Sequence, residues 1–195
     1  MNTVEAASST DEALMIEELL RKHHPSGLYA DVWRIGCNWG LRVTDLLAVK
    51  YSDLDLGKKE LRVVESKTGS VRDILLTPKV LEIIKRRREA NPEDIYLFQA
   101  KSNNLKGEVK PMHRGTLSKV LCDVSHTLSN LPLAEGKRRI NTHSMRKTKG
   151  MSLFRAKVPL EEIARSLGHR DSRVTARYLG IDRSRIMQSY ADHEI

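Results

Sequence analysis

The sequence is poor in cysteine and contains no long run of apolar residues. Its two cysteines, Cys37 and Cys122, lie far apart in the 195 residues and form no CxxC pattern. A disulfide scaffold and a cysteine-rich zinc site are therefore not expected, and a reducing cytoplasm fits this usage. The longest uninterrupted apolar run is four residues, whereas a membrane-spanning helix needs about 20. No basic-then-apolar leader is visible at the first residues, so we expect neither secretion nor membrane anchoring.

Several widespread site motifs are also missing. The sequence has no GxxxxGK[ST] phosphate loop, no GxGxxG, no HExxH and no GxSxG. These absences argue against a P-loop nucleotidase, a dinucleotide enzyme, a zincin protease and a serine hydrolase. We expect no metal and no other cofactor, because four of the seven histidines have no companion at ligand spacing. These four are His23, His24, His113 and His126.

What the sequence does have is an excess of positive charge in one segment. Lysine and arginine number 34 against 25 aspartates and glutamates, a net charge of +9. Residues 137–185 hold 14 of the basic and four of the acidic residues, while the other 146 residues hold 20 and 21. A solvated basic surface would explain an even spread of charge, but this concentration favours a nucleic-acid partner.

Hydrophobic spacing predicts a mainly α-helical protein with one small antiparallel β-sheet, an α+β fold in a single compact domain. Ser9 and Glu12 form a capping-box pattern before the first helix, and Pro78 is typical of a helix start. We expect residues 1–10 to be a flexible lead-in and 11–195 to be the domain. The expected helices are one ending near residue 21, then 28–38, 42–49, 79–90, 115–128, 142–156, 159–167, 171–180 and 182–191. The expected strands are 60–65 and 70–76, joined as a hairpin, with a short strand or extended segment at 95–98.

Two stretches in the first half of the chain carry a cation that core packing does not explain. Arg42 directly follows the turn at Gly40 in GLRVTDLL, at the start of an amphipathic helix. Asp45 lies one helical turn on, where it can hold the Arg42 guanidinium by a salt bridge. Lys67 lies at the predicted hairpin tip in SKTG. Taken singly, a surface ion pair and a solvated lysine would explain both stretches.

Three further stretches lie in the basic segment. His143 and Arg146 are three apart on one predicted helix, so they face one way and can both reach one phosphate. His169 follows Gly168, which ends a predicted helix and exposes the next side chain. Tyr178 comes nine residues after His169. Each of these residues also has an ordinary structural explanation when it is taken alone.

In combination the five stretches resemble the tyrosine recombinase (phage integrase) family. The matching order is GLRVTDLL, SKTGS between two strands, THSMRKT, LGHR, and a tyrosine nine residues beyond that histidine. The resemblance runs from about Leu14 to the C-terminus. It implies the fold of the tyrosine recombinase catalytic domain. It also implies a catalytic set of Arg42, Lys67, His143, Arg146, His169 and Tyr178, with Asp45 in support.

The chemistry of these residue types suits a phosphodiester. The two arginines offer bidentate donors to its non-bridging oxygens. Tyr178 is the implied nucleophile, and ionising a phenol of pKa ~10 at pH 7 requires about 4 kcal/mol. Much of this free energy must come from nearby cations and from a base that accepts the phenolic proton. His143 is the natural candidate for that base. Lys67 can protonate the departing 5′ oxygen, and His169 can donate a hydrogen bond to the phosphate.

The resemblance therefore implies a site-specific DNA recombinase or integrase that cleaves and rejoins strands through a 3′-phosphotyrosyl intermediate. Neither ATP nor a metal is implied, because cationic side chains stabilise the charge on the phosphate, a role that magnesium takes in other enzymes. The implied partners are double-stranded DNA and further copies of the chain, with a monomer when free and a tetramer on two DNA sites during synapsis. Residues 182–195 would pack on a neighbouring protomer, although a plain closing helix explains them equally well. The implied setting is the cytoplasm, with a bacterial, phage or mobile-element origin.

The chain also departs from the family pattern. Lys147 stands where histidine is frequent, and Lys149 stands where an apolar or aromatic residue is usual. Nothing before Thr10 can supply the N-terminal helical domain that completes a clamp around DNA in many members. We therefore expect either an excised catalytic domain or a naturally short recombinase.

Two other functions stay open. A type IB topoisomerase uses similar side chains and religates the same strand, but such enzymes are usually monomeric and a C-terminal docking segment argues against one. A non-catalytic DNA-binding regulator would keep only a relic of the site, and the complete set of six residues counts against it.

Overall fold

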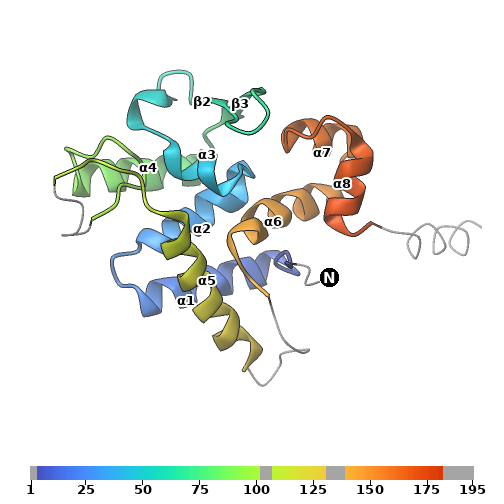
Figure 1. Ribbon diagram of the computed structural model, residues 1–195, viewed down its shortest axis with the longest axis horizontal. Coiled ribbons are helices and arrows are strands. Elements are labelled where there is room, and N and C mark those ends of the chain that lie inside the picture. The colour runs from blue at the N-terminus through green and yellow to red at the C-terminus, as the bar shows by residue number, and fades with distance from the viewer. Residues whose placement is uncertain (1–3, 102–106, 131–138, 182–195) are drawn as a thin grey trace, which may run out of the picture.

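The computed structural model describes residues 4–101, 107–130 and 139–181. Its elements are α1 (Thr10–His23), α2 (Leu28–Trp39), α3 (Val43–Ala48), the 3₁₀ turn η1 (Tyr51–Asp53), β1 (Leu54–Asp55), β2 (Glu60–Val64), β3 (Val71–Leu75), α4 (Pro78–Ala90), α5 (Arg114–Ser129), α6 (Thr142–Arg155), α7 (Leu160–Ser166) and α8 (Ser172–Leu179). Figure 1 shows α1 to α5 gathered around α2, with β2 and β3 above them and α7 and α8 beyond α6. The predicted α+β class is confirmed. Over the described ranges, no helix combines the length and apolar character needed to cross a membrane.

The first two helices begin and end where their local signals predict. The Ser9 hydroxyl at the N-cap of α1 accepts a hydrogen bond from the Glu12 amide at 3.0 Å. α2 ends at Gly40, whose φ of 60° lies in the left-handed region that glycine adopts without a Cβ penalty. A Cβ at Gly40 would lie 3.0 Å from Cγ of Lys149. The turn that leads into Arg42 is therefore held closely against α6.

The main hydrophobic core lies around α2. Trp33 is almost fully buried there, against Ile16 and Leu20 of α1. On another side α6 crosses α2 so closely that a Cβ on Gly36 would lie 2.4 Å from Sδ of Met145. This close approach places the first turns of α6 beside the end of α2.

A second, smaller core joins α7 and α8. Its buried members are Ile163, Leu167 and Leu179. α6 connects this small core to the main one, because a Cβ on Gly150 would lie 2.7 Å from Cδ2 of Leu179. The two cores thus share α6 as their common support.

The sheet has three antiparallel strands in the order β1-β2-β3. β2 and β3 form the predicted hairpin, in which Glu60 lies opposite Leu75 at the base. β1 was not predicted, because a strand of two residues shows no alternation of side chains. The extended segment expected at 95–98 contributes an isolated bridge between Tyr96 and Lys50 and, in the described part of the chain, adds no strand to the sheet.

The described part of the expected flexible lead-in packs against α6. Ala7 is fully buried, and its amide donates a hydrogen bond to Oγ1 of Thr148 at 2.9 Å. Lys147 Nζ donates to the Val4 carbonyl at 3.1 Å. Small residues, which suggested disorder in the sequence, here let the backbone lie against the helix. The difference arises from contacts 141 residues apart, which no local pattern reports.

The other described helices agree with the predicted ranges to within two residues. The predicted helix at 182–191 lies outside the described residues. So do residues 102–106 and 131–138.

Candidate active site

Arg146 lies in the second turn of α6 and is 3% exposed. The helix is capped by Asn141, whose side chain accepts a hydrogen bond from the His143 amide at 2.8 Å. The Arg146 guanidinium donates through Nη1 to the Gly40 carbonyl at 3.0 Å and through Nη2 to the Leu167 carbonyl. It therefore joins the turn after α2 to the end of α7.

Arg42 lies beside Arg146, but its ionic partner is not the predicted one. Its Nη1 pairs with Oε2 of Glu65, and no ion pair with Asp45 forms among the described residues. Arg42 is the extended N-cap residue of α3, so its side chain does not lie over the helical turn that carries Asp45. Asp45 is buried and accepts a hydrogen bond from the Ser66 amide at 3.0 Å. It thereby fixes the base of the hairpin tip.

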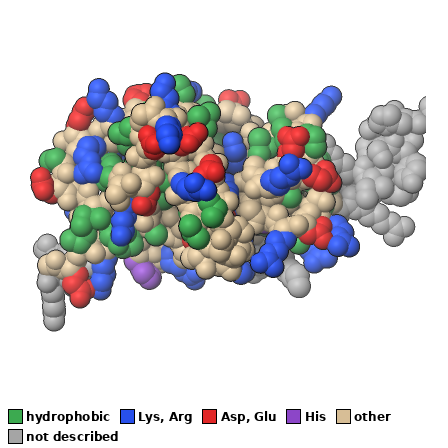
Figure 2. Space-filling model, turned by 90° about the horizontal axis from the view of Figure 1, so that it is seen from above, with side chains coloured by type: hydrophobic (Ala, Val, Ile, Leu, Met, Phe, Trp, Pro, Cys, Tyr) green, Lys and Arg blue, Asp and Glu red, His purple; other side chains and the backbone are tan. Residues whose placement is uncertain are grey.

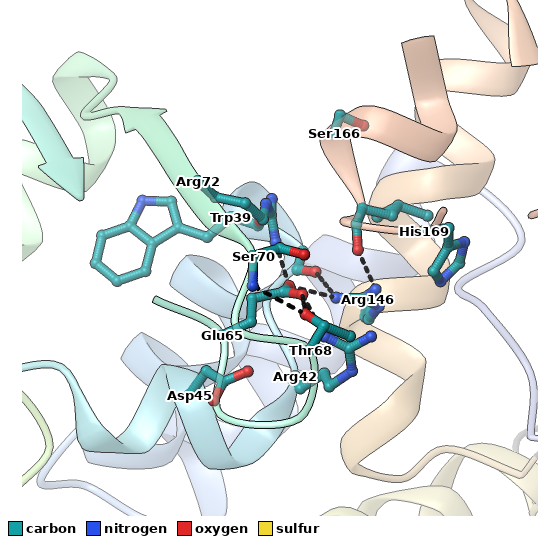
Figure 3. A network of polar contacts seen from close by, with 12 residues as sticks. Trp39, Arg42, Asp45, Glu65, Thr68, Ser70, Arg72, Arg146, Ser166 and His169 are labelled. Atoms are coloured by element: carbon teal, nitrogen blue, oxygen red, sulfur yellow. Dashed lines mark hydrogen bonds and ion pairs between the residues drawn. The ribbon is translucent and has the colours of Figure 1, made fainter. Parts of the chain in front are cut away.

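Glu65 was not predicted as a site residue, yet it lies at the centre of the site (Figure 3). The carboxylate is fully buried. Besides the pair with Arg42, its Oε1 lies 3.3 Å from Nη1 of Arg72 and 3.5 Å from Nη1 of Arg146. The Thr68 hydroxyl donates to Oε2 at 3.0 Å. Three arginines from separate segments therefore face one carboxylate.

Alternation along β2 is the signal that would have identified Glu65. Leu61 is buried and Val63 is half-buried, while the residues between them are exposed. The same period of two places Glu65 on the inward face, directly before the hairpin tip. A carboxylate on that face requires cationic or hydrogen-bonding partners.

Burial and the neighbouring charges shift the pKa values of Glu65, Arg72 and Arg146. Burial by itself would raise the pKa of Glu65, but hydrogen bonds and charges, those of Arg42 first, bring it below its usual value. Burial, followed by the charge of Arg42, lowers the pKa of Arg146 to about 10. Burial also lowers the pKa of Arg72, against the attraction of Glu65. The cluster stays ionised at pH 7 with more positive than negative charge, which suits an anionic ligand.

His169 faces this cluster from the turn between α7 and α8. The preceding Gly168 has a φ of 63°, and a Cβ there would lie 2.6 Å from Oε2 of Glu65. Glycine therefore lets the turn approach the carboxylate. His169 Nδ1 lies 2.9 Å from Oγ1 of Thr175. Burial, then the charge of Arg146, lowers the pKa of His169 to about 4, so the ring is neutral at pH 7.

Tyr178 on α8 contacts both histidine residues. Its ring stands edge-on to that of His169, with centroids 5.4 Å apart. Its hydroxyl donates a hydrogen bond to the main-chain carbonyl of His143 at 3.3 Å, so this contact involves the backbone and not the imidazole. Burial raises the pKa of Tyr178 to about 12, against the charges of Arg146 and Arg42. The phenol is therefore protonated in this state.

His143 and Lys67 form the exposed side of the site. Burial lowers the pKa of His143, and the charges of Arg146, Arg114 and Lys67 act in the same direction. The imidazole is therefore neutral at pH 7 and able to accept a proton. Lys67 is exposed at the hairpin tip and has no hydrogen-bond partner in the described ranges. The charge of Lys67 helps to lower the pKa of His143, so the two side chains belong to the same side of the molecule.

The structure thus gathers the predicted residues from four segments that are far apart in the sequence. Arg42, His143, Arg146, His169 and Tyr178 lie in one site, with Lys67 at its exposed edge and Asp45 behind the hairpin. The arrangement offers guanidinium donors for an anion with two oxygens, two neutral imidazoles and one hydroxyl nucleophile.

The face over the strands shows no single basic patch. Figure 2 looks down on it and shows lysine and arginine mixed with acidic and hydrophobic side chains. Exposed apolar side chains of the hairpin include Val64, Val71 and Leu75.

A sequence model of the phage integrase family matches residues 16–185. Among curated proteins, the chain is similar to YoeC of Bacillus subtilis (strain 168), which is described as a probable integrase/recombinase. The two are 26% identical over 190 residues, which is 97% of each chain. The match therefore extends over nearly the full length of both proteins.

Two solved structures have the same fold. The XerA recombinase superposes with a TM-score of 0.71 at 19% identity, over 100% of this chain and 66% of that one. The Tn1549 transposon integrase, in complex with a circular intermediate DNA, has a TM-score of 0.73 at 17% identity, over 89% of this chain and 61% of that one. The chain thus spans less than two thirds of either solved recombinase. The predicted tyrosine recombinase catalytic-domain fold is confirmed.

Proposed function

The chain belongs to the phage integrase family, and from this premise we propose that it cuts and rejoins DNA strands through a 3′-phosphotyrosyl link to Tyr178. The observation that carries the proposal is the meeting of four distant segments at one site. Arg146 bonds the backbone on both sides of that site, and Tyr178 lies against His169 and His143. A chain that had kept only the fold would have no need of this constellation.

In the proposed reaction, Arg42 and Arg146 bind the scissile phosphate. Hydrogen bonds to the Gly40 and Leu167 carbonyls engage two of the five N–H groups of Arg146, and Nη1 also lies 3.5 Å from Glu65, so N–H groups remain for a ligand. Arg42 is engaged through Nη1 and is 20% exposed. The two guanidinium groups would hold the non-bridging oxygens, whose charge grows in the transition state.

Tyr178 is the proposed nucleophile. Its hydroxyl oxygen attacks phosphorus, and the bond from phosphorus to the 5′ oxygen breaks as the tyrosyl bond forms. The phenolic proton passes to the neutral imidazole of His143. The hydroxyl is now bonded to the main-chain carbonyl of His143, so it must rotate away from that carbonyl as the phosphate arrives.

Lys67 and His169 complete the proposed reaction. The Lys67 ammonium gives a proton to the departing 5′ oxygen, and its exposed place at the hairpin tip lets it approach. In the tautomer whose Nδ1 accepts from the Thr175 hydroxyl, the ring proton of His169 lies on Nε2 and is donated to a phosphate oxygen. Because His169 is neutral at pH 7, it acts as a hydrogen-bond donor and not as an acid.

Rejoining reverses these steps with a different 5′ hydroxyl. That hydroxyl attacks the phosphotyrosine, a phosphodiester forms and Tyr178 recovers its proton. One phosphate ester replaces another at each step, so the proposed reaction uses no ATP, and side-chain cations take the role of a metal ion. The proposed partner is double-stranded DNA, on which four copies assemble over two sites from free monomers. The proposed setting is the cytoplasm, where that DNA lies.

Covalent capture tests the proposal. A pool of nicked suicide duplexes with a randomised central segment is incubated with the full chain, so that cleavage releases a short fragment and traps the adduct. We expect a protein–DNA adduct that survives denaturation, and sequencing the trapped duplexes yields the substrate for later work. Tyr178→Phe should yield no adduct, because the nucleophilic oxygen is absent.

Tyr96→Phe is the matched control, since it removes a phenol outside the site, and its adduct yield should equal that of the wild type. Binding of the pool without any adduct would contradict the enzyme and indicate a DNA-binding regulator. An adduct that relaxes supercoiled plasmid but never joins strands of two duplexes would indicate a topoisomerase.

A further inference from the structure

Glu65 is the residue at which the four segments of the site meet. It follows the last residue of β2 and pairs with Arg42 from the turn after α2. It accepts a hydrogen bond from Thr68 of the hairpin and faces Arg146 of α6. The turn before His169 approaches it through Gly168, where a Cβ would be 2.6 Å from the carboxylate. Arg146 reaches the same segments, through the carbonyls of Gly40 and Leu167 and through Glu65 itself.

The carboxylate lies on the protein side of the arginines. Glu65 is fully buried, whereas Arg42 is 20% exposed. Its two oxygens are divided between the arginines, because Oε2 faces Arg42 while Oε1 faces Arg146 and Arg72 (Figure 3). A phosphate that arrives from solvent would therefore meet the opposite side of the guanidinium groups. The carboxylate and the phosphate would occupy different positions.

Three guanidinium groups at this spacing repel one another unless a negative charge lies between them. The charge of Arg42 already lowers the pKa of Arg146. Without Glu65, the partly exposed Arg42 would be free to turn toward water, while Arg146 would keep its bonds to two carbonyls. Catalysis depends on donors that are in place before the charge develops, and a displacement of about 1 Å can slow a reaction about 10²-fold.

From this geometry we infer that Glu65 is a positioning residue, which sets Arg42 against Arg146 before DNA binds so that both can take one phosphate. The inference rests on the proposed function for the identity of the ligand. The positioning itself is a property of the free chain. Gly168 contributes by leaving room for the carboxylate, and Thr68 orients Oε2.

Glu65→Gln is the decisive variant. It keeps the size of the side chain but removes the charge, and its amide NH₂ would face a guanidinium group. We expect adduct formation at saturating DNA to slow about 10²-fold, while the affinity for the duplex selected with the wild type changes far less. Glu60→Gln is the matched control, because it removes the same charge from an exposed position on β2, the strand that leads to Glu65. Its rate should equal that of the wild type.

A measurement without DNA reports the positioning directly. In ¹⁵N spectra of the free chain, the Nε–H groups of Arg42 and Arg146 should exchange slowly with water. Glu65→Gln should broaden or remove the Arg42 resonance. It should leave unchanged the resonance of Arg87 on α4, whose Nε donates to the Leu97 carbonyl and whose Nη1 pairs with Asp31. The backbone amide spectrum of the same sample shows whether the variant is folded.

Glu65→Asp provides a second variant if Glu65→Gln does not fold. It keeps the charge and withdraws the carboxylate by one methylene, so we expect cleavage slower than in the wild type and faster than in Glu65→Gln. A folded Glu65 variant with wild-type cleavage and unchanged Arg42 and Arg146 resonances would overturn the inference. So would a parallel loss of cleavage, affinity, melting temperature and the Arg87 resonance, because a general structural role would then account for everything.

The two proposals fail in different ways. If the wild type forms no Tyr178-dependent adduct, the proposed function falls, while the spectra of the free chain still report whether Glu65 positions Arg42. If the adduct forms and Glu65→Gln matches the wild type in rate and spectrum, only the positioning role falls.

Discussion

The molecule contains two buried carboxylates that each face three arginines, and they do different things. Asp31 on α2 pairs with Arg21 at 3.1 Å, Arg86 at 2.5 Å and Arg87 at 3.3 Å. Two of these arginine side chains are 39% and 48% exposed. They come from α1 and α4, so the Asp31 cluster fastens two helices to α2.

The Glu65 cluster also combines one carboxylate with three arginines, but its arginines are more deeply buried. The side chains of Arg42, Arg72 and Arg146 are 20%, 9% and 4% exposed. Two neutral histidines and a tyrosine hydroxyl lie beside it, whereas in the described ranges no histidine or tyrosine side chain is hydrogen-bonded to Asp31 or its three arginines. The comparison teaches that arginines around a carboxylate do not by themselves indicate a site. A functional site is indicated where some of the guanidinium N–H groups have no protein acceptor and lie beside side chains that can donate or accept a proton.

The largest expected effect is on the cleavage rate, which should depend on the arginines of the Glu65 cluster and not on those of the Asp31 cluster. Arg146→Lys removes the planar fork from the proposed phosphate site, so cleavage should slow about 10²- to 10³-fold. Arg87→Lys makes the same change in the Asp31 cluster and should leave the cleavage rate per folded molecule unchanged. Rates of adduct formation on the selected duplex check both. An equal slowing by the two substitutions would remove the distinction between the clusters.

A second substitution separates them by stability. Asp31→Asn leaves three arginines without their shared charge, and we expect the free energy of unfolding to fall by about 3 kcal/mol. Two of those arginines already reach water, which places the effect at the low end for a broken buried ion pair. Urea unfolding measures the change. The cleavage rate below the unfolding transition should stay that of the wild type, and a specific loss of cleavage would contradict a purely structural role.

A matched pair of glycines sharpens the comparison further. Gly27 and Gly168 both have left-handed φ, 69° and 63°. A Cβ at Gly27 would meet the flexible end of Arg21 at 3.0 Å, whereas one at Gly168 would meet the buried Glu65 carboxylate at 2.6 Å. Gly27→Ala should therefore destabilise by about 1 kcal/mol and Gly168→Ala by about 2–3 kcal/mol.

Only Gly168→Ala should also slow cleavage, because only there does the new methyl group push a carboxylate that contacts the site. Thermal unfolding and adduct formation measure the two effects. Equal losses of stability in the two variants would mean that the Glu65 carboxylate can move aside.

The smallest expected effect is a dependence of stability on pH. The folded-state pKa of His169 is lowered to about 4 from 6.5, so the unfolded chain binds a proton first as the pH falls. Stability contributed by the neutral ring is present above pH 6.5 and is lost between 6.5 and about 4. Because the ring is half-exposed, we expect this loss to be about 1 kcal/mol.

His169→Gln should flatten the curve of unfolding free energy between pH 6.5 and 4. His126→Gln, at an exposed position on α5, should leave the slope unchanged. A slope that is the same in wild type and His169→Gln would show that another group is responsible.

Local patterns predicted most of the helices and the hairpin, and the resemblance to the phage integrase family supplied the candidate residues that lie together at the site. Capping at Ser9, the turn at Gly40 and the strands around Lys67 are signals contained in a few neighbouring residues, and the structure follows them. The five motifs could be recognised for the same reason, because each one consists of a few residues that are adjacent in the sequence.

The misses concern partners that are distant in the sequence. Asp45 was assigned to Arg42 by helical spacing, but Arg42 lies outside the helix and pairs with Glu65, 23 residues away. In the sequence Glu65 resembles an ordinary strand residue, and only the fold brings three arginines from other segments to its carboxylate. Ala7 resembles part of a flexible lead-in, and only the fold brings it to the Thr148 hydroxyl. Such contacts depend on the assembled fold, which neither propensity nor spacing describes.

The small core beneath α7 and α8 has a consequence for how the site opens. In the described part of the chain its buried residues are Ile163, Leu167 and Leu179, whereas Leu41 next to Arg42 and Leu61 of the hairpin belong to the main core. Regions with few buried apolar side chains open at lower free energy than the rest of a protein. In hydrogen exchange, the amides of α8 should therefore lose protection well before those of α2. The tyrosine would then be carried on a hinged unit that can withdraw while the arginines keep their places.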